Sequence, residues 1–154
     1  MRRQMRPVTI LIADDDADDR MLLQDAFIEN QLANELKFVN DGEELLAYLR
    51  REGPYAAAGA SPSPGIILLD LNMPRLDGRE ALRIIKSDAH FHRIPVVVLT
   101  TSRAEEDILN TYELGVSSFI TKPVTFVGLI KIVRVLSTYW TEIVALPQVG
   151  VAHP

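Results

Sequence analysis

The sequence predicts an α/β fold, doubly wound around a five-stranded parallel sheet. Short continuous runs of Ile, Val and Leu, typical of strands buried on both faces, alternate with segments of helical periodicity. Such alternation along the whole chain favours a parallel sheet with right-handed crossovers. The strands are expected at residues 9–13, 36–39, 66–69, 96–99 and 118–121.

Five helices are expected, each introduced by residues that favour a helix N-terminus through capping or through charge in the first turn. They begin after Asp16, at Asp41, at Asp77–Gly78, at Ser102 and at Thr125, and the fourth ends near Gly115. Between the second helix and the third strand, residues 51–65 are rich in Gly, Pro, Ala and Ser. This segment is predicted to be an exposed and partly mobile loop.

The 154 residues suffice for one domain with a substantial core. We expect a flexible N-terminus at 1–7, the α/β domain at 8–137 and a C-terminal extension at 138–154, with no second domain. The net charge of -5 gives no general attraction to nucleic acid or anionic lipid. Cysteine is absent, and neither a signal peptide nor a run long enough to span a bilayer is present. A cytoplasmic protein that binds neither nucleic acid nor membrane is expected.

Four predicted strands deliver polar or charged groups at the same end. Asp14 and Asp15 follow the first strand, Asp70 the third, Thr100 the fourth and Lys122 the fifth. The carboxyl ends of parallel strands lie together, and ligands bind in the crevice outside them. Three carboxylates there suit Mg²⁺, and a carboxylate near Mg²⁺ can act as a nucleophile toward a phosphoryl donor. Lys122 and Thr100 can then stabilise the phosphoryl oxygens.

Simpler interpretations of these residues stay open. Any one of the N-terminal aspartates can be only a helix cap, and Thr100 can serve only to satisfy a backbone group at a strand end. Lys122 on its own is typical of a solvated lysine, although its place between a buried strand and Pro123 favours a role in the site.

The last predicted helix is longer and more apolar than one sheet requires. Phe126, Val133 and Trp140 are spaced by seven residues, and Leu129, Leu136 and Ile143 form a second row. From 125 to 144 it would be roughly 30 Å long, against about 17 Å for a five-residue strand. A homodimer is therefore expected, with 138–154 as the dimerisation arm and the contact residues Phe126, Val133, Trp140 and Ile143. In the alternative, Trp140 folds back on its own domain.

The motifs together resemble the receiver domains of two-component response regulators. The matching residues are Asp14–Asp15, the run Asp70-Leu71-Asn72-Met73-Pro74 with Asp77–Gly78, Thr100–Thr101 and Lys122–Pro123. The resemblance covers roughly residues 8–137, with four motifs agreeing in order and spacing. It implies a flavodoxin-like fold with strand order 2-1-3-4-5.

The same resemblance implies roles for individual residues. Asp70 matches the phosphoacceptor, Thr100 the switch hydroxyl and Lys122 the lysine that meets the phosphoryl group. Asp15 and Asp70 would bind Mg²⁺ directly, Asp14 through water and Asn72 through its backbone carbonyl. Phe119 matches the aromatic switch residue, which would turn inward after Thr100 moves toward the phosphoryl group. Lys122–Pro123 would be a cis peptide.

A more specific resemblance is to the stand-alone regulators that pair with bacterial phytochrome histidine kinases. It depends on the acidic run 14–19, the long 51–65 segment and the tail 139–147. It implies a phosphoacceptor signalling protein that catalyses only its own phosphorylation and dephosphorylation. Three rivals remain: a Mg²⁺-dependent phosphohydrolase, disfavoured because Asn72 replaces the acid/base Asp; a receiver used only for docking; and a flavodoxin-type cofactor binder.

Overall fold

The computed structural model describes residues 8–101 and 113–138, and within them the predicted parallel sheet is confirmed. The strands are arranged in the order β2-β1-β3-β4-β5, all parallel. Their bounds are β1 (Thr9–Ala13), β2 (Leu36–Val39), β3 (Pro64–Leu69), β4 (Val96–Thr100) and β5 (Ser118–Thr121). The described helices are α1 (Ala17–Glu29), α2 (Gly42–Arg50), α3 (Gly78–Ser87) and α5 (Phe126–Thr138), with a short 3-10 turn, η1 (Gly53–Tyr55).

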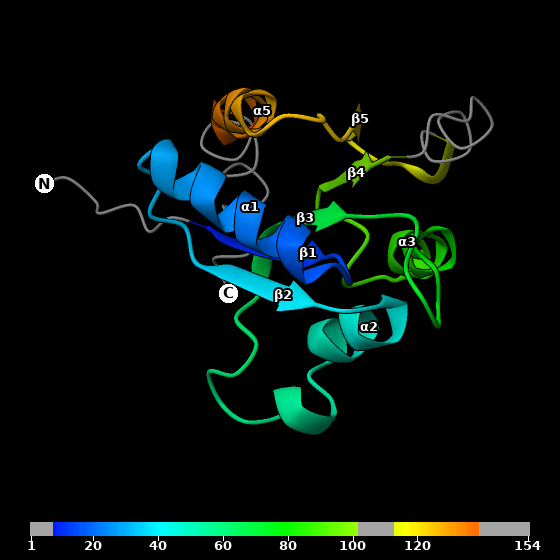
Figure 1. The fold of residues 1–154 in the computed structure, drawn as a ribbon. Helices are drawn as coiled ribbons and strands as arrows, with labels where there is room; N and C mark the ends of the chain where they lie inside the picture. Colours follow the sequence, from blue (N-terminus) through cyan, green and yellow to red (C-terminus); the bar gives the residue numbers. More distant parts are fainter. Residues whose placement is uncertain (1–7, 102–112, 139–154) are drawn as a thin grey trace, which may run out of the picture.

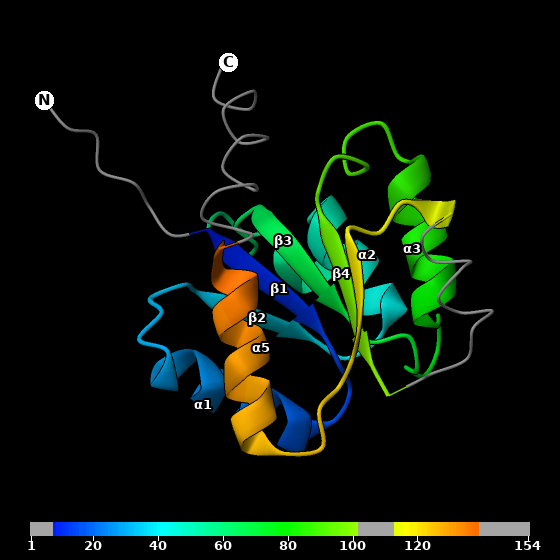
Figure 2. The same ribbon diagram turned by 90° about the horizontal axis from the view of Figure 1, so that it is seen from above.

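The helices cover both faces of the sheet, α1 and α5 on one side and α2 and α3 on the other (Figures 1 and 2). The fourth predicted helix falls on residues 102–112, outside the described residues. Gly115, where that helix was expected to end, has a φ of 100°, a left-handed conformation common after a helix. The last helix is described to Thr138, and the rest of its predicted length also lies outside the described residues.

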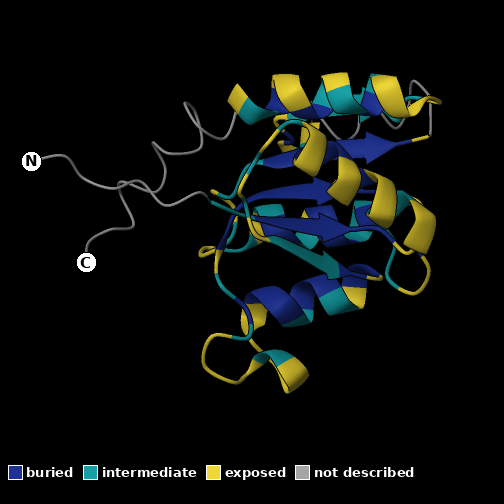
Figure 3. Ribbon diagram, turned by 60° about the vertical axis from the view of Figure 1, so that its left-hand side comes forward, coloured by how far each residue is buried: buried dark blue, intermediate teal, exposed yellow. Residues whose placement is uncertain are grey.

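Successive residues of each central strand point into two separate cores. In β3, Ile67 and Leu69 pack toward α2 and α3, whereas Ile66 and Leu68 pack toward α1 and α5. This alternation explains why the strand sequences are apolar at every position. Figure 3 shows the result, a buried sheet between helices whose outer faces are exposed. The sheet is therefore rigid, and its carboxyl edge can hold side chains in fixed positions.

The segment 51–65 is more ordered than the expected exposed loop. Ser61 is buried and its hydroxyl donates to the backbone oxygen of Tyr55 at 3.0 Å. The Tyr48 hydroxyl donates to the backbone oxygen of Pro62 at 2.8 Å. The third strand begins at Pro64, two residues before its predicted start. Residues 51–54 and 56–59 are exposed as expected, whereas the end of the segment, from Ser61 to Gly65, is bound to the domain through Tyr48 and the start of β3.

Tyr48 gives the fold a specific sensitivity to alkaline pH. Burial, with a contribution from the charge of Glu35, raises the pKa of Tyr48 to about 12, against about 10 in an unfolded chain. The neutral phenol therefore stabilises the folded state below pH 10, and this stabilisation is lost as the pH rises from 10 toward 12. We expect the free energy of unfolding to fall by up to about 3 kcal/mol over this range. Urea unfolding at successive pH values measures it.

The matched variant for this prediction is Tyr48→Phe. It should lose about 1 kcal/mol at neutral pH because the hydrogen bond to Pro62 is gone. It should also show a smaller fall in stability above pH 10 than the wild-type chain. The same alkaline slope in both proteins would contradict the assignment to Tyr48.

Candidate functional site

The predicted polar residues meet at the carboxyl edge of the sheet. Figure 2 shows the arrowheads of β1, β3 and β4 pointing to the same edge. Lys122 Nζ lies 2.8 Å from Asp14 Oδ2 and 3.2 Å from Asp70 Oδ2. Thr100 Oγ1 lies 3.0 Å from Asp70 Oδ1. Four strand ends thus contribute to one site, as the parallel topology requires.

Both carboxylate oxygens of Asp70 accept hydrogen bonds. Oδ1 accepts from the Thr100 hydroxyl at 3.0 Å and from the backbone N–H of Asn72 at 3.0 Å. Oδ2 accepts from the Lys122 ammonium. The side chain is nearly buried, so these hydrogen bonds are made with little competition from water. The geometry fixes one carboxylate orientation, which is what a nucleophile requires.

Gly78 allows α3 to begin directly beside Asp70. A Cβ atom at this position would lie 2.5 Å from the backbone oxygen of Asp70 and 2.7 Å from the Cα of Leu71. Gly78 also donates its N–H to the Leu71 oxygen at 3.1 Å. Asp77 caps the same helix by accepting from the N–H groups of Arg79 and Glu80. The Asp77–Gly78 pair therefore positions the loop that follows β3.

Three carboxylates gather beside this loop. Asp14, Asp15 and Asp70 each offer an oxygen, and these atoms lie within 4.8 Å of one another. Asp14 is buried and Asp15 is exposed. Burial raises the pKa of the Asp14 carboxyl, and the hydrogen bond from Lys122 opposes that rise. Oxygen donors at this spacing fit a hard divalent cation, which would also relieve their mutual repulsion.

Asn72 was expected to bind the metal through its carbonyl. The structure places its backbone N–H on Asp70 and its side-chain amide 3.3 Å from Thr100 Oγ1. The first contact lies within the loop after β3, and the second joins that loop to the end of β4. The carbonyl's role as a ligand stays a prediction.

Carboxylate groups surround the ammonium of Lys122. Burial on its own would lower the pKa of the ammonium, but hydrogen bonds to Asp14 and Asp19 and the charges of Asp14 and Asp70 raise it well above its ordinary value. The group is therefore positively charged at neutral pH and over most of the alkaline range. A fixed positive charge beside Asp70 suits the stabilisation of phosphoryl oxygens.

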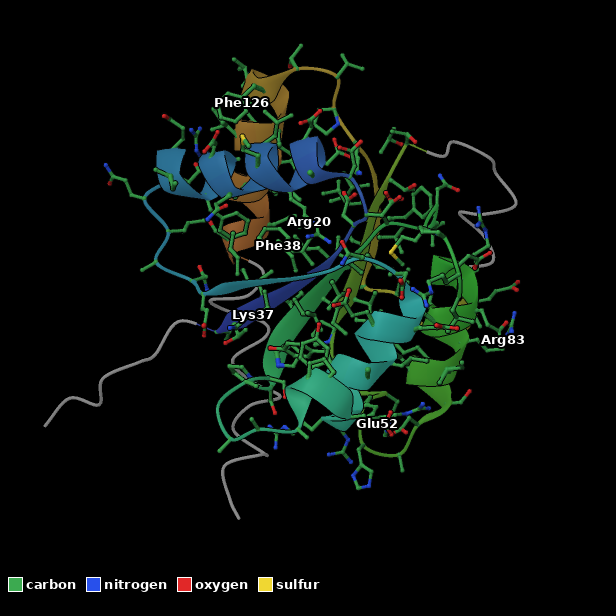
Figure 4. All side chains as sticks on the ribbon, turned by 60° about the horizontal axis from the view of Figure 1, so that its bottom comes forward. Arg20, Lys37, Phe38, Glu52, Arg83 and Phe126 are labelled. Atoms are coloured by element: carbon green, nitrogen blue, oxygen red, sulfur yellow. The ribbon has the colours of Figure 1, made fainter. Side chains whose placement is uncertain are left out.

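Two residues of α1 were missed as members of the site. Asp19 Oδ2 lies 2.7 Å from Lys122 Nζ, and Arg20 Nε donates to the Asp14 backbone oxygen at 2.8 Å. The Arg20 guanidinium also lies 5.6 Å from the centre of the Phe38 ring, as Figure 4 illustrates. Their position in the first turns of the helix that starts at the site was the sequence feature that could have predicted these contacts. The sequence interpretation gave Asp19 only a role toward the helix dipole.

The two proposed switch residues are both placed by the structure. Thr100 is fully buried and donates to Asp70 in the unmodified chain, and its movement toward a phosphoryl group stays a prediction. Phe119 is partly buried and packs against the core on the side of α2 and α3. The predicted cis peptide is wrong, because no peptide bond of the described residues is cis, Lys122–Pro123 included. In the trans form the Lys122 N–H donates to the Thr100 oxygen at 2.8 Å, which holds the loop against β4.

The residues predicted for the dimer separate into three groups. Val133 is 1% exposed and packs in the core of its own domain, so its assignment to the dimer interface is wrong. Phe126 is 37% exposed at the start of α5 (Figure 4), and Trp140 and Ile143 lie outside the described residues. The outer face of α5 instead presents Val127 and Val135 to solvent.

A pocket opens beside the site between α1 and the start of α5. Its volume is about 80 Å³, and its lining includes Asp19, Leu22, Lys122, Val124 and Phe126. Leu22, Val124 and Phe126 are exposed apolar side chains. The pocket therefore joins an apolar surface to the ammonium that contacts Asp70. In the described ranges, no helix combines the length and the apolar character needed to cross a bilayer.

Comparison with known proteins gives consistent matches. The response regulator receiver domain model matches residues 10–134. The response regulator Rcp1 of Synechocystis sp. is 41% identical over 141 residues, which cover 92% of this chain and 94% of that protein. The phosphorylated cyanobacterial phytochrome response regulator RcpA has a TM-score of 0.81 at 43% identity, with 89% of this chain and 96% of RcpA covered. The Mn²⁺-bound form of Rcp1 has a TM-score of 0.80 at 40% identity, with the same coverage.

Proposed function

The chain belongs to the family of response regulator receiver domains, and from this premise we propose that Asp70 accepts a phosphoryl group from a sensor histidine kinase. Phosphorylation on aspartate and dependence on Mg²⁺ are general in this family. The observation that carries the assignment to Asp70 is its position, held by Thr100 and Lys122 with Asp14 and Asp15 alongside. The chain is then a signalling protein, not an enzyme for a separate metabolite.

The proposed reaction transfers the phosphoryl group from a histidine nitrogen to a carboxylate oxygen. An oxygen of Asp70 attacks phosphorus, the P–N bond breaks as the P–O bond forms, and the imidazole leaves with a proton. When bound, Mg²⁺ supplies positive charge to the phosphoryl oxygens and orients the donor. Lys122 and Thr100, which donate to the Asp70 carboxylate in the unmodified chain, would redirect these hydrogen bonds to the phosphoryl oxygens.

Asp14, Asp15 and Asp70 would hold the metal, with the Asn72 carbonyl as a further ligand. Their oxygens have the spacing and the chemistry that Mg²⁺ accepts. The existence of a Mn²⁺-bound form of Rcp1, at 40% identity, supports the binding of a divalent cation by this chain. The rival phosphohydrolase is disfavoured because Asn72, which points its amide at Thr100, offers no acid/base group.

The proposed donor is a histidine kinase of the bacterial phytochrome class. The similarity to Rcp1 and to the phytochrome response regulator RcpA supports it. The pocket beside Lys122 gives such a partner an apolar surface next to the acceptor, formed by Leu22, Val124 and Phe126. Because the kinase draws on ATP, the exchange is expected in the cytoplasm.

Phosphotransfer from a purified kinase tests the function. Bacterial phytochrome kinases labelled with radioactive ATP should pass the label to this chain in Mg²⁺ and not in EDTA. Restoring Mg²⁺ should restore the transfer, because the metal is needed at the acceptor. Failure of every kinase and of acetyl phosphate to label the chain in Mg²⁺ would refute the proposal.

We also propose that the chain forms a homodimer through α5 and the segment 138–154. The exposed Val127 and Val135 on α5, with Phe126 near its start, provide apolar surface that a second copy would cover. Truncation after Ser137 should give a monomer, and Val135→Asp should weaken the dimer. Analytical ultracentrifugation at micromolar concentration distinguishes these states.

Ile28→Asp is the matched control for the dimer, because Ile28 is equally an exposed apolar residue but lies on α1. This variant should sediment as the wild-type chain does. A wild-type chain that sediments as a monomer would show that the dimer proposal is wrong.

A further inference from the structure

The Lys122 ammonium has three carboxylate partners, and one of them is outside the metal cluster. Nζ lies 2.8 Å from Asp14 Oδ2, 2.7 Å from Asp19 Oδ2 and 3.2 Å from Asp70 Oδ2. A lysine ammonium has three N–H groups, so these acceptors use all of them. The contact with Asp70 is the longest of the three. Asp14 and Asp19 thus hold the ammonium more closely than Asp70 does.

Asp19 differs from the other two carboxylates in its surroundings. Its side chain is 36% exposed, whereas that of Lys122 is 13% exposed. It lies in the first turn of α1 and lines the pocket together with Leu22 and Val124. The carboxylate group that can gather around a metal comprises Asp14, Asp15 and Asp70, and Asp19 is not in it. Asp19 therefore acts on the ammonium without acting as a metal ligand.

We propose that Asp19 is a positioning residue that holds Lys122 back from Asp70 until a phosphoryl group arrives and then releases it. The inference rests on the proposed role of Asp70. A phosphoryl group adds negative charge and three acceptor oxygens at Asp70, and it needs an N–H group from Lys122. The N–H group now on Asp70 can pass to one phosphoryl oxygen, so a second N–H group for the phosphoryl group has to come from Asp14 or Asp19.

Asp19 is the carboxylate that gives way. Asp14 is buried, and a bound cation keeps it in place, whereas Asp19 is half open to water and can be solvated once it is released. Its release leaves an unpaired carboxylate at the rim of the pocket, beside the apolar side chains of Leu22 and Val124. Phosphorylation would thereby change the charge and shape of the surface at α1, in addition to any change near Phe119.

The test compares Asp19→Asn with Asp18→Asn. Both remove one negative charge from the first turn of α1, but in the described part of the chain the Asp18 side chain has no hydrogen bond or ion pair. Beryllofluoride with Mg²⁺ serves as the phosphoryl mimic. Asp19→Asn should bind it about fivefold more tightly, because a neutral amide oxygen competes less for the Lys122 ammonium and a nearby like charge is gone. Asp18→Asn should change the affinity by less than about twofold.

Nuclear magnetic resonance gives a second measurement, the chemical shifts of methyl groups beside Asp19. These shifts would not change on ligand binding if Asp19 had only a structural role. In the wild-type chain, beryllofluoride should shift the methyl signals of Leu22 and Val124 as Asp19 is released. In Asp19→Asn these shifts should be much smaller, because a neutral amide oxygen holds the ammonium only weakly before the ligand binds. Asp19→Ala should behave in the same way.

Three outcomes would overturn the inference. They are an unchanged or weaker affinity in Asp19→Asn, an equal gain in Asp18→Asn, or full methyl shifts in Asp19→Asn. A wild-type chain that neither binds beryllofluoride nor accepts a phosphoryl group would instead refute the proposed role of Asp70, and this inference with it.

Discussion

Replacing Asp70 with Asn should abolish phosphorylation by a cognate kinase and by acetyl phosphate. An amide cannot form the acyl phosphate, so no slower route through the same residue exists. The replacement keeps the shape of the side chain, and its oxygen can still accept from Thr100 and from the N–H of Asn72. The fold should therefore persist. Intact-protein mass spectrometry after incubation with acetyl phosphate and Mg²⁺ measures the result.

Asp25→Asn is a suitable control, since Asp25 is exposed on α1, away from the site. This variant should gain one phosphoryl group, as the wild-type chain does. Undiminished labelling of Asp70→Asn would place the acceptor elsewhere and remove the basis of the proposed function.

Removing Asp15 should cause the second large effect, a loss of Mg²⁺ affinity. The residue is exposed, and its carboxylate belongs to the cluster with Asp14 and Asp70. Asp15→Ala should weaken Mg²⁺ binding by at least about tenfold, by loss of a direct ligand and of one negative charge. The metal-free protein should become modestly more stable, because one source of repulsion is gone. Calorimetric titration with Mg²⁺ and urea unfolding in EDTA measure the two effects.

Asp18→Asn again provides the control, because it removes a charge three residues away without touching the cluster. Its Mg²⁺ affinity should stay close to that of the wild-type chain. Equal affinity in the wild-type chain and in Asp15→Ala would mean that Asp15 is not a ligand.

The strands and most of the site could be predicted because they depend on local pattern and on topology. A continuous apolar run such as Val96–Thr100 allows few interpretations other than a buried strand, and parallel order brings the strand ends together. The strand pattern and the parallel order were sufficient to predict four residues of the site, Asp14, Asp70, Thr100 and Lys122. The early start of β3 could not be predicted, because Pro64 and Gly65 are usual signs of a loop. Proline is tolerated here as the first residue of a strand, and glycine is required because a Cβ would lie 2.5 Å from the Val8 side chain.

Apart from the predicted cis peptide, the errors at the site and at α5 concern contacts between elements that are far apart in the sequence. Val133 fits the seven-residue spacing of an interface, but the same spacing describes the side of α5 that packs on the sheet and on α1. Asp19 is a normal residue for the first turn of a helix. Only the position of α1 beside the loop after β5 brings it to Lys122. Neither fact is contained in the local sequence.

The hydrogen bond from Thr100 to Asp70 limits how the signal can be transmitted. The Thr100 hydroxyl carries a single proton, so a bond to a phosphoryl oxygen would replace the bond to Asp70 Oδ1 and would not add to it. A modifying group shifts an equilibrium between two conformations only by the difference between its interactions with each. A hydrogen bond exchanged between two charged acceptors contributes little to that difference. Discrimination between the phosphorylated and unmodified forms must then come from added charge and from the groups it displaces, and a partner would distinguish them through electrostatics more than through a rearranged backbone.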